Sequence, residues 1–307
     1  MEQEKQLDLK AFPSIDMSIP LRYCKPEVTA DAFRFYEFQM MAKTTFAGVA
    51  RKQGLKEGEE WKVVGSFNRK SLDDMLAEMD EIGVERCVMP AIKLWSRRDH
   101  ALAMDYKVED IAELVKKSNG RVIGGAGYNP FRIQESLEEI EVAVKEYGFK
   151  YVWFHPISFG LPPNDKKCYP LYAKCVELGI TVGYQSGHSA EPLPSEPGHP
   201  MYADEAILDF PELTMILTHT GWPWIEEWCS MVWKHPNVYG CINAYFPSAI
   251  EQHQVRFIDS PRGRGKVVCG SHGFGMTRFK KELLELPVSE KTKSAVLRDN
   301  AIKALKL

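Results

Sequence analysis

The chain has 307 residues, 44% of them hydrophobic, which is enough to bury the core of one large domain. Its formal net charge of -3 at pH 7 and its isoelectric point near 6.3 provide no broad cationic surface of the kind that attracts nucleic acid or an anionic membrane. These values argue against nucleic-acid and membrane partners and favour chemistry on a small-molecule substrate.

The N-terminus and the cysteines indicate a cytoplasmic protein. Residues 1–5 read Met-Glu-Gln-Glu-Lys and lack the apolar stretch of a signal peptide. No uninterrupted apolar run approaches the length needed to span a membrane. The seven cysteines include no Cys-x-x-Cys pair, so we expect reduced thiols and neither a zinc-thiolate site nor a redox site.

The first predicted strand is an apolar run at residues 12–19. The connection after it, residues 20–69, contains an aromatic and methionine-rich run that predicts a helical insertion packed on the barrel, with a lid or a contact between subunits as the alternatives. From residue 80 onward, β-branched runs alternate with amphipathic stretches, as expected when a helix follows each parallel strand. Seven further strands are predicted at residues 85–90, 121–126, 150–155, 180–185, 213–219, 238–244 and 266–271.

Two helices have clear boundary signals. Ser71 is a predicted N-cap before an acidic first turn, and Gly83 ends the same helix. A second stretch of helical apolar spacing begins at Gln134 and ends at Gly148. Because the strands recur roughly every 25 to 35 residues, the pattern predicts one α/β domain over residues 1–307, a (β/α)8 TIM barrel with a helical insertion after strand 1.

Polar side chains recur at the ends of the predicted strands. The interior of a parallel barrel is packed, so polar groups that react gather at its C-terminal mouth, and we expect these side chains to share one pocket. The strand ends and the residues just after them supply Asp16, Ser18, Asn129, His155, Gln185, His188, His219, Asn243 and His272. The remaining histidines are expected at the surface, and they are His100, His199, His235 and His253.

Several segments resemble the amidohydrolase superfamily. Residues 210–213 (Phe-Pro-Glu-Leu) and 218–221 (Thr-His-Thr-Gly) are similar to its F-P-x-L…H-x-G pattern, and residues 269–272 (Cys-Gly-Ser-His) are similar to its G-S-D segment. Residues 299–301 (Asp-Asn-Ala) resemble the closing E-N-A helix of the branch that includes aminocarboxymuconate-semialdehyde decarboxylase and resorcylate decarboxylase. The resemblance runs from residue 12 to the end and implies a TIM-barrel enzyme.

The resemblance also implies one divalent ion, held by a His-x-His or Glu-x-His pair on strand 1, a histidine on strand 5, sometimes one on strand 6, and an aspartate on strand 8. This chain has Ser18 and Pro20 on strand 1, Gln185 on strand 5 and His272 on strand 8, which leaves only His219. A serine hydroxyl, a proline ring and a neutral amide are poor or impossible ligands for zinc or manganese, so we expect no cofactor. The alternative is one Zn or Mn ion in a rebuilt site of His155, His219 and His272, with Asp16 or His188.

Without a metal to activate water, hydrolysis needs a general base and donors for a developing oxyanion. Imidazole suits the base role because its ordinary pKa lies near 6.5. We predict that the catalytic residues are His272, His219 and His155. Gln185 and Asn243 are expected to donate hydrogen bonds to a carbonyl or enolate oxygen, and Arg278 to hold a carboxylate. The full predicted substrate-binding set is Asp16, Ser18, Gln185, His188, Asn243, Trp153 and Arg278.

The expected function is that of an amidohydrolase-like, metal-independent hydrolase that cleaves a C–C, lactone or amide bond in a small cyclic carbonyl or carboxylate compound. Decarboxylation and hydration stay open, as does a metal-dependent hydrolase or decarboxylase at the rebuilt histidine site. A non-catalytic barrel that binds a small ligand is the alternative from another class. We expect a homo-oligomer, with residues 20–69 as the contact.

Overall fold

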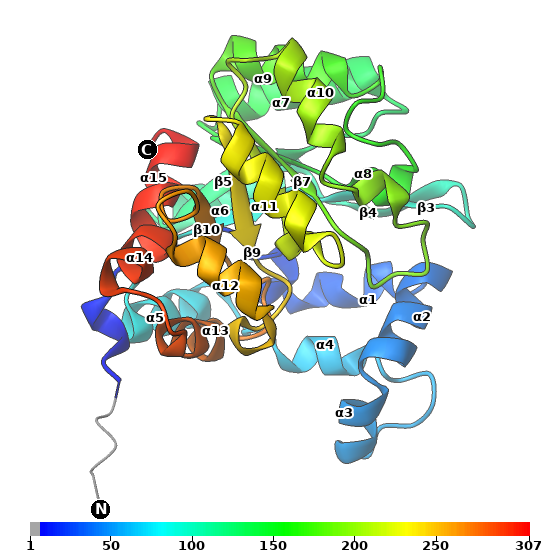
Figure 1. Cartoon of the computed structure of the whole chain (residues 1–307). Helices are drawn as coiled ribbons and strands as arrows, with labels where there is room; N and C mark the ends of the chain where they lie inside the picture. Colours follow the sequence, from blue (N-terminus) through cyan, green and yellow to red (C-terminus); the bar gives the residue numbers. More distant parts are fainter. Residues whose placement is uncertain (1–6) are drawn as a thin grey trace, which may run out of the picture.

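The computed structural model describes residues 7–307, and its main element is a nearly closed sheet of eight parallel strands (Figure 1). In spatial order the strands are β1 (Ser14–Asp16), β2 (Val84–Pro90), β5 (Val122–Gly127), β6 (Tyr151–Phe154), β7 (Thr181–Gln185), β8 (Met215–Thr218), β9 (Val238–Ile242) and β10 (Val267–Cys269). The N–H of Met17 donates to the carbonyl of Cys269 over 2.9 Å and joins the last strand to the first. The predicted TIM barrel is therefore confirmed, and every predicted strand overlaps an observed one.

Helices surround the barrel and complete the βα units. The helices from the first to the eighth are α1 (Thr29–Ala32), α2 (Tyr36–Thr45), α3 (Ala47–Lys52), α4 (Lys62–Ser66), α5 (Leu72–Ile82), α6 (Val108–Lys117), α7 (Ile133–Lys145) and α8 (Pro156–Phe159). The rest are α9 (Tyr169–Leu178), α10 (Tyr202–Asp209), α11 (Ile225–Lys234), α12 (Gln252–Asp259), α13 (Met276–Glu285), α14 (Glu290–Ser294) and α15 (Asn300–Leu305). No helix within residues 7–307 is both long and apolar enough to cross a bilayer.

The ends of α5 follow the signals in the sequence. The Ser71 hydroxyl accepts the N–H of Asp74 at 3.2 Å, and Gly83 ends the helix in a left-handed conformation with φ of 70°. Such a conformation is easy for glycine because it has no Cβ, so the predicted cap and stop are both confirmed.

The core of the barrel is filled by buried side chains from seven of its eight strands, among them Ile15, Val88, Ile123, Tyr151, Ile216, Cys241 and Val268. The large Tyr151 side chain fits because its neighbour on β7 is Gly183. A Cβ at Gly183 would lie only 1.7 Å from the Tyr151 hydroxyl oxygen. The interior is thus a packed core, and the space for a ligand lies at the end of the barrel.

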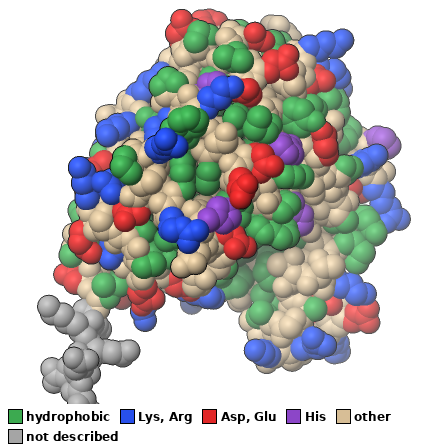
Figure 2. Space-filling view, in the orientation of Figure 1, with side chains coloured by type: hydrophobic (Ala, Val, Ile, Leu, Met, Phe, Trp, Pro, Cys, Tyr) green, Lys and Arg blue, Asp and Glu red, His purple; other side chains and the backbone are tan. Residues whose placement is uncertain are grey.

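Residues 20–69 form the helical insertion predicted after strand 1. They contain α1 to α4, and α2 to α4 project from the barrel at the lower right of Figure 1. Positive and negative side chains are interspersed over the face shown in Figure 2, with no large patch of one sign. The prediction that the N-terminus is not a signal peptide concerns residues 1–5, which lie outside the described residues.

Two features differ from the prediction. An antiparallel hairpin of β3 (Lys93–Ser96) and β4 (Ala101–Asp105) lies between β2 and α6 and was not predicted. Its turn contains no glycine or proline that would have indicated it in the sequence. The left-handed position of the turn is occupied by His100, with φ of 52°. His235, expected at the surface, is buried, and its Nε2 lies 2.6 Å from the Asp204 carboxylate. Burial of this imidazole is possible because the Asp204 carboxylate, on α10, is its hydrogen-bond partner.

Candidate active site at the barrel mouth

A cavity of about 570 Å³ lies at the C-terminal ends of the strands. This volume is within the range of about 300 to 1,000 Å³ that is typical of small-molecule sites. One wall consists of polar side chains from the strand ends, namely His155, Gln185, His219 and His272. A second, aromatic wall comes from the insertion and includes Phe33, Phe38, Met41, Phe46 and Phe67. The insertion therefore supplies an aromatic surface to the same cavity into which the barrel places its imidazoles.

The backbone at the mouth turns sharply where the strands end. His219, Thr220, Ala244 and His272 have φ angles of 65°, 62°, 62° and 55°, in the left-handed region that residues with a Cβ rarely occupy. Such conformations cost about 1–3 kcal/mol each and are commonly kept where a site needs a particular side-chain direction. Two of the three predicted catalytic histidines are held in this way.

The tautomer of His219 follows from its neighbours. The Thr218 hydroxyl donates to the carbonyl of Tyr184 at 2.9 Å, so its oxygen is an acceptor toward the Nδ1 of His219, which also lies at 2.9 Å. Nδ1 therefore carries the proton, and Nε2 has a free lone pair. The backbone N–H of His219 donates to the Oδ1 of Asn243 at 2.7 Å, which fixes the start of the turn.

His272 is held from strand 1. Its Nδ1 lies 3.0 Å from the Ser18 hydroxyl, and its ring packs edge-on to that of His219 with centroids 4.8 Å apart. The Asp16 carboxylate accepts the backbone N–H groups of Ser18 and Ser271 at 3.0 Å each. A Cβ at Gly270 would lie 2.7 Å from the Ser18 nitrogen, so glycine is needed for β1 and β10 to approach this closely.

The tautomer of His155 follows from a hydrogen bond to its own helix, α8. Its Nδ1 accepts the N–H of Ser158 at 3.0 Å, which leaves the proton on Nε2, and its side chain is hydrogen-bonded to Gln185. The amide nitrogen of Gln185 donates in turn to the carbonyl of His188 at 3.4 Å. His155 and Gln185 therefore brace each other on this side of the cavity.

All three imidazoles are neutral at neutral pH. Burial lowers the pKa of His155 to about 3, aided by repulsion from His219, and burial alone lowers the pKa of His219 to about 3. Burial, followed by repulsion from His219 and Arg22, lowers the pKa of His272 well below its ordinary value. The ordinary pKa near 6.5, which suggested imidazole as the base, therefore does not apply to these three buried side chains.

The structure brings together most of the predicted site residues. His155, His219, His272, Gln185, His188, Trp153 and Arg278 line the cavity. The Asp16 carboxylate and the Oδ1 of Asn243 accept backbone N–H groups, and the Ser18 hydroxyl contacts His272. Asp16, Ser18 and Asn243 thus position other residues, and this geometry gives no support to direct contact between them and a substrate.

Several residues of the cavity wall were not predicted, among them Arg22, Tyr106 and Glu191. Arg22 follows strand 1 directly in an otherwise apolar segment, which is the signal that could have indicated it. Glu191 lies in the proline-rich connection after β7, and burial raises the pKa of its carboxyl group.

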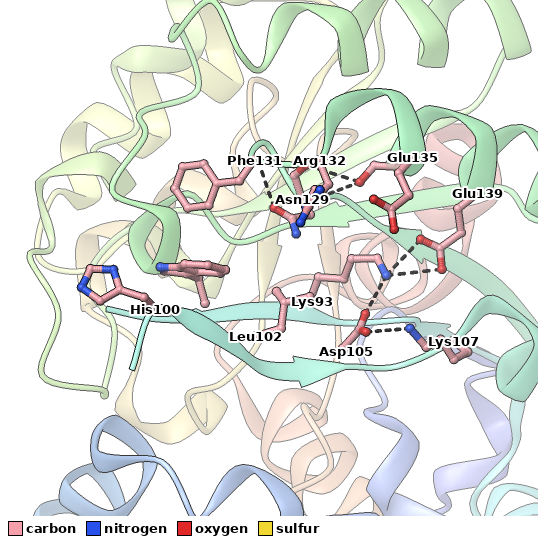
Figure 3. Close-up of a pocket in the computed structure, with 12 residues that line it drawn as sticks. Lys93, His100, Leu102, Asp105, Lys107, Asn129, Phe131, Arg132, Glu135 and Glu139 are labelled. Atoms are coloured by element: carbon pink, nitrogen blue, oxygen red, sulfur yellow. Dashed lines mark hydrogen bonds and ion pairs between the residues drawn. The ribbon is translucent and has the colours of Figure 1, made fainter. Parts of the chain in front are cut away.

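A second cavity, of about 430 Å³, lies outside the mouth between the β3–β4 hairpin and the start of α7 (Figure 3). Asn129, expected at the mouth, lines this cavity instead. The ammonium group of Lys93 lies 2.9 Å from both Asp105 and Glu139, so its charge is balanced within the protein. We therefore place the chemistry at the mouth, where the imidazoles converge.

A TIM barrel with buried ionisable groups around one cavity at its C-terminal mouth has the arrangement of an enzyme. The family model described as amidohydrolase matches residues 66–267. The chain belongs to this family and is an enzyme of the amidohydrolase superfamily, as the resemblance implied. No curated protein matches the sequence.

Solved structures of the same fold cover nearly the whole chain. An uncharacterised TIM-barrel protein from Bordetella bronchiseptica is 21% identical, with 96% of this chain and 98% of that chain covered and a TM-score of 0.71. A dihydroxybenzoic acid decarboxylase from a Polaromonas species is 17% identical, with coverage of 96% and 97% and a TM-score of 0.66. A 5-carboxyvanillate decarboxylase from Novosphingobium aromaticivorans is 15% identical, with coverage of 97% of each chain and a TM-score of 0.64.

Both of these decarboxylases were crystallised with manganese. This finding contradicts the expectation that no cofactor is needed, which rested only on the absence of ligand-type residues from the sequence.

The side chains at the mouth nevertheless do not fit the family's usual ion. Within residues 7–307, no group of three or more His, Cys, Asp or Glu side chains is arranged to hold a metal. The Nδ1 of His155 accepts the N–H of Ser158, which leaves a proton on Nε2, and the position on strand 5 holds a neutral amide, Gln185. We therefore derive no catalytic step through a metal ion.

Proposed function

We propose that the protein is a decarboxylase of a small cyclic carboxylate, with hydroxylated benzoates as the substrate class to test first. One observation supports this proposal most strongly: three neutral imidazoles and a buried arginine line the same cavity as an aromatic wall. A planar ring that bears a carboxylate would place its charge on the polar wall and its ring against the aromatic wall.

The comparisons favour decarboxylation over the hydrolysis expected from the sequence. Two similar structures are named as decarboxylases of hydroxylated aromatic acids. Membership of an enzyme family also favours catalysis over a barrel that only binds a ligand.

Decarboxylation replaces the bond between a ring carbon and CO2 with a C–H bond, so one proton must reach that carbon as CO2 leaves. Burial keeps the imidazoles neutral, but a bound carboxylate would add a negative charge beside them and raise their pKa. Substrate binding therefore favours proton uptake on the Nε2 of His219, whose other nitrogen is fixed as N–H by Thr218. The imidazolium is then the general acid that protonates the ring carbon.

The test is incubation of the purified protein with 2,6-dihydroxybenzoate, 5-carboxyvanillate and salicylate. We expect at least one acid to yield equal amounts of CO2, measured by gas analysis, and of the matching phenol, measured by chromatography. The protein is assayed as purified, after dialysis against a chelator, and after addition of Mn²⁺, so that any metal requirement is measured at the same time. Hydrolysis of lactones or amides, with no CO2 from any of the acids, would contradict the proposal.

The role of Thr218 gives a second prediction. Thr218→Val removes the acceptor that fixes the Nδ1–H tautomer of His219, and we expect kcat for the accepted acid to fall by about 10- to 100-fold, the effect typical of losing such an orienting partner. Thr218→Ser keeps the hydroxyl and should retain most of the activity. Nitrogen-15 NMR of the imidazoles should show a mixed His219 tautomer in the valine variant, and an unchanged tautomer there would argue against the assignment.

A further inference from the structure

Arg22 is a buried cation on the wall of the mouth cavity. It lies in the short 3-10 helix Leu21–Tyr23, a few residues after β1, and only 8% of its surface is exposed. Its side chain lines the cavity together with His272 and Phe274. The guanidinium carbon lies 5.7 Å from the centre of the Phe274 ring.

The guanidinium group is held in place by neutral acceptors. Its Nη1 donates to the Oδ1 of Asn68 at 2.8 Å, and its Nη2 donates to the carbonyl of His272 at 3.5 Å. Asn68 is itself oriented, because its amide nitrogen donates to the Thr29 hydroxyl at 2.8 Å. The position of Arg22 is thus fixed by the insertion, while most of its five N–H donors stay available for a ligand.

The charge of Arg22 has no counter-ion in the part of the chain that the structure describes. Burial lowers its pKa to about 10, so it stays cationic at neutral pH, and no carboxylate is among the groups that shift this pKa. An isolated buried charge is unfavourable unless it is paired. The other buried cations are satisfied in one of two ways. Lys93 lies between two carboxylates (Figure 3). Lys280 instead gives its ammonium protons to the Ser14 hydroxyl and to the carbonyls of Ile82 and Gly83.

We propose that Arg22 is the residue that binds the carboxylate of the ligand and that it orients the ligand in the cavity. The carboxylate accepts hydrogen bonds from the guanidinium group beside His272, and the ring of the ligand extends toward Phe33, Phe38 and Phe46 of the insertion. The inference rests on the proposed function for the class of ligand, but it concerns binding and needs no turnover.

Arg278, the arginine expected from the sequence to hold a carboxylate, is less suited to this role. Its side chain is 61% exposed, its Nε lies 2.6 Å from Glu282, and its guanidinium carbon lies 3.5 Å from the centre of the Phe246 ring. An exposed cation that already has a partner contributes little to the recognition of an anion. Arg278 lies at the rim of the cavity and Arg22 lies inside it.

The test compares a carboxylate probe with a neutral analogue of the same shape, salicylate and salicylamide, by titration calorimetry. The wild-type protein should bind salicylate at least about tenfold more tightly than salicylamide, as expected for a charge-assisted hydrogen bond. Arg22→Gln should lose this preference, and Arg22→Lys should keep part of it. The matched control Arg278→Gln should keep the wild-type preference.

Thermal unfolding without ligand separates binding from a structural role. If Arg22 serves the ligand, Arg22→Gln should unfold at the same temperature as the wild-type protein or higher, since it removes an uncompensated charge. Three outcomes would overturn the inference. Arg22→Gln could keep the preference for salicylate, or the wild-type protein could bind no salicylate at millimolar concentration. The third is a loss of binding that merely follows unfolding of both Arg22 variants. If the wild-type protein prefers salicylate over salicylamide and Arg22→Gln does not, but no acid releases CO2, only the decarboxylase proposal is contradicted.

Discussion

Replacing His219 with asparagine is expected to lower kcat for the accepted acid by about 10²- to 10⁴-fold, the usual contribution of a positioned general acid. The asparagine amide can still donate to Thr218, as Nδ1 does now, but it has no group equivalent to Nε2. Asparagine also tolerates the φ of 65° at this position, so the backbone turn should persist. The measurement is steady-state kinetics of the wild-type and variant enzymes.

The chain offers a matched control for this substitution. His100 also has a left-handed backbone, with φ of 52°, but it lies at the exposed turn of the β3–β4 hairpin. His100→Asn should leave kcat unchanged. A kcat for His219→Asn within about threefold of the wild-type value would remove His219 from the proton transfer.

The second large effect is a loss of stability in acid. The pKa of His219 is about 3 in the folded protein, below its ordinary value of 6.5 in an unfolded chain. Above pH 6.5 the imidazole of His219 is neutral in both the folded and the unfolded state. Below pH 6.5 it is protonated in the unfolded chain but stays neutral in the folded protein. Each such imidazole therefore lowers the free energy of unfolding by up to about 1.4 kcal/mol per pH unit as the pH falls toward 3. His155, whose pKa is also about 3, lowers the free energy of unfolding in acid in the same way.

Asp16 acts in the opposite direction, because burial raises its pKa from 3.8 to about 6 and the folded state takes up its proton first. The effect of a single imidazole is therefore measured by difference. Between pH 6 and 4, denaturant unfolding of the wild-type protein should lose about 1.4 kcal/mol per pH unit more than that of His219→Asn. Equal slopes in the two proteins would mean that the pKa of His219 is not lowered by folding.

Much of the fold could be predicted from the sequence because the alternation of strand and helix patterns is local information. Each βα unit has its own apolar run and its own helix-stop residue, such as Gly83. A parallel barrel also brings all strand ends to one mouth, so the convergence of His155, His219 and His272 followed from topology alone.

The depth and partners of the site residues could not be predicted in the same way. The role of Asp16 depends on the contact between the first and last strands, 255 positions apart in the chain. The depressed pKa values depend on burial by the insertion and on neighbouring imidazoles, which a single strand does not reveal. Arg22 was missed for the same reason, because only the folded chain shows that it faces the cavity without a counter-ion.

The most direct test of the account is nitrogen-15 NMR of the eight histidines between pH 8 and 5. We expect at least three imidazoles to stay neutral down to pH 5, with the signals of His155, His219 and His272, assigned by substitution, among them. Titration of these three residues near pH 6.5, as for imidazoles exposed to water, would contradict their burial together in one cavity.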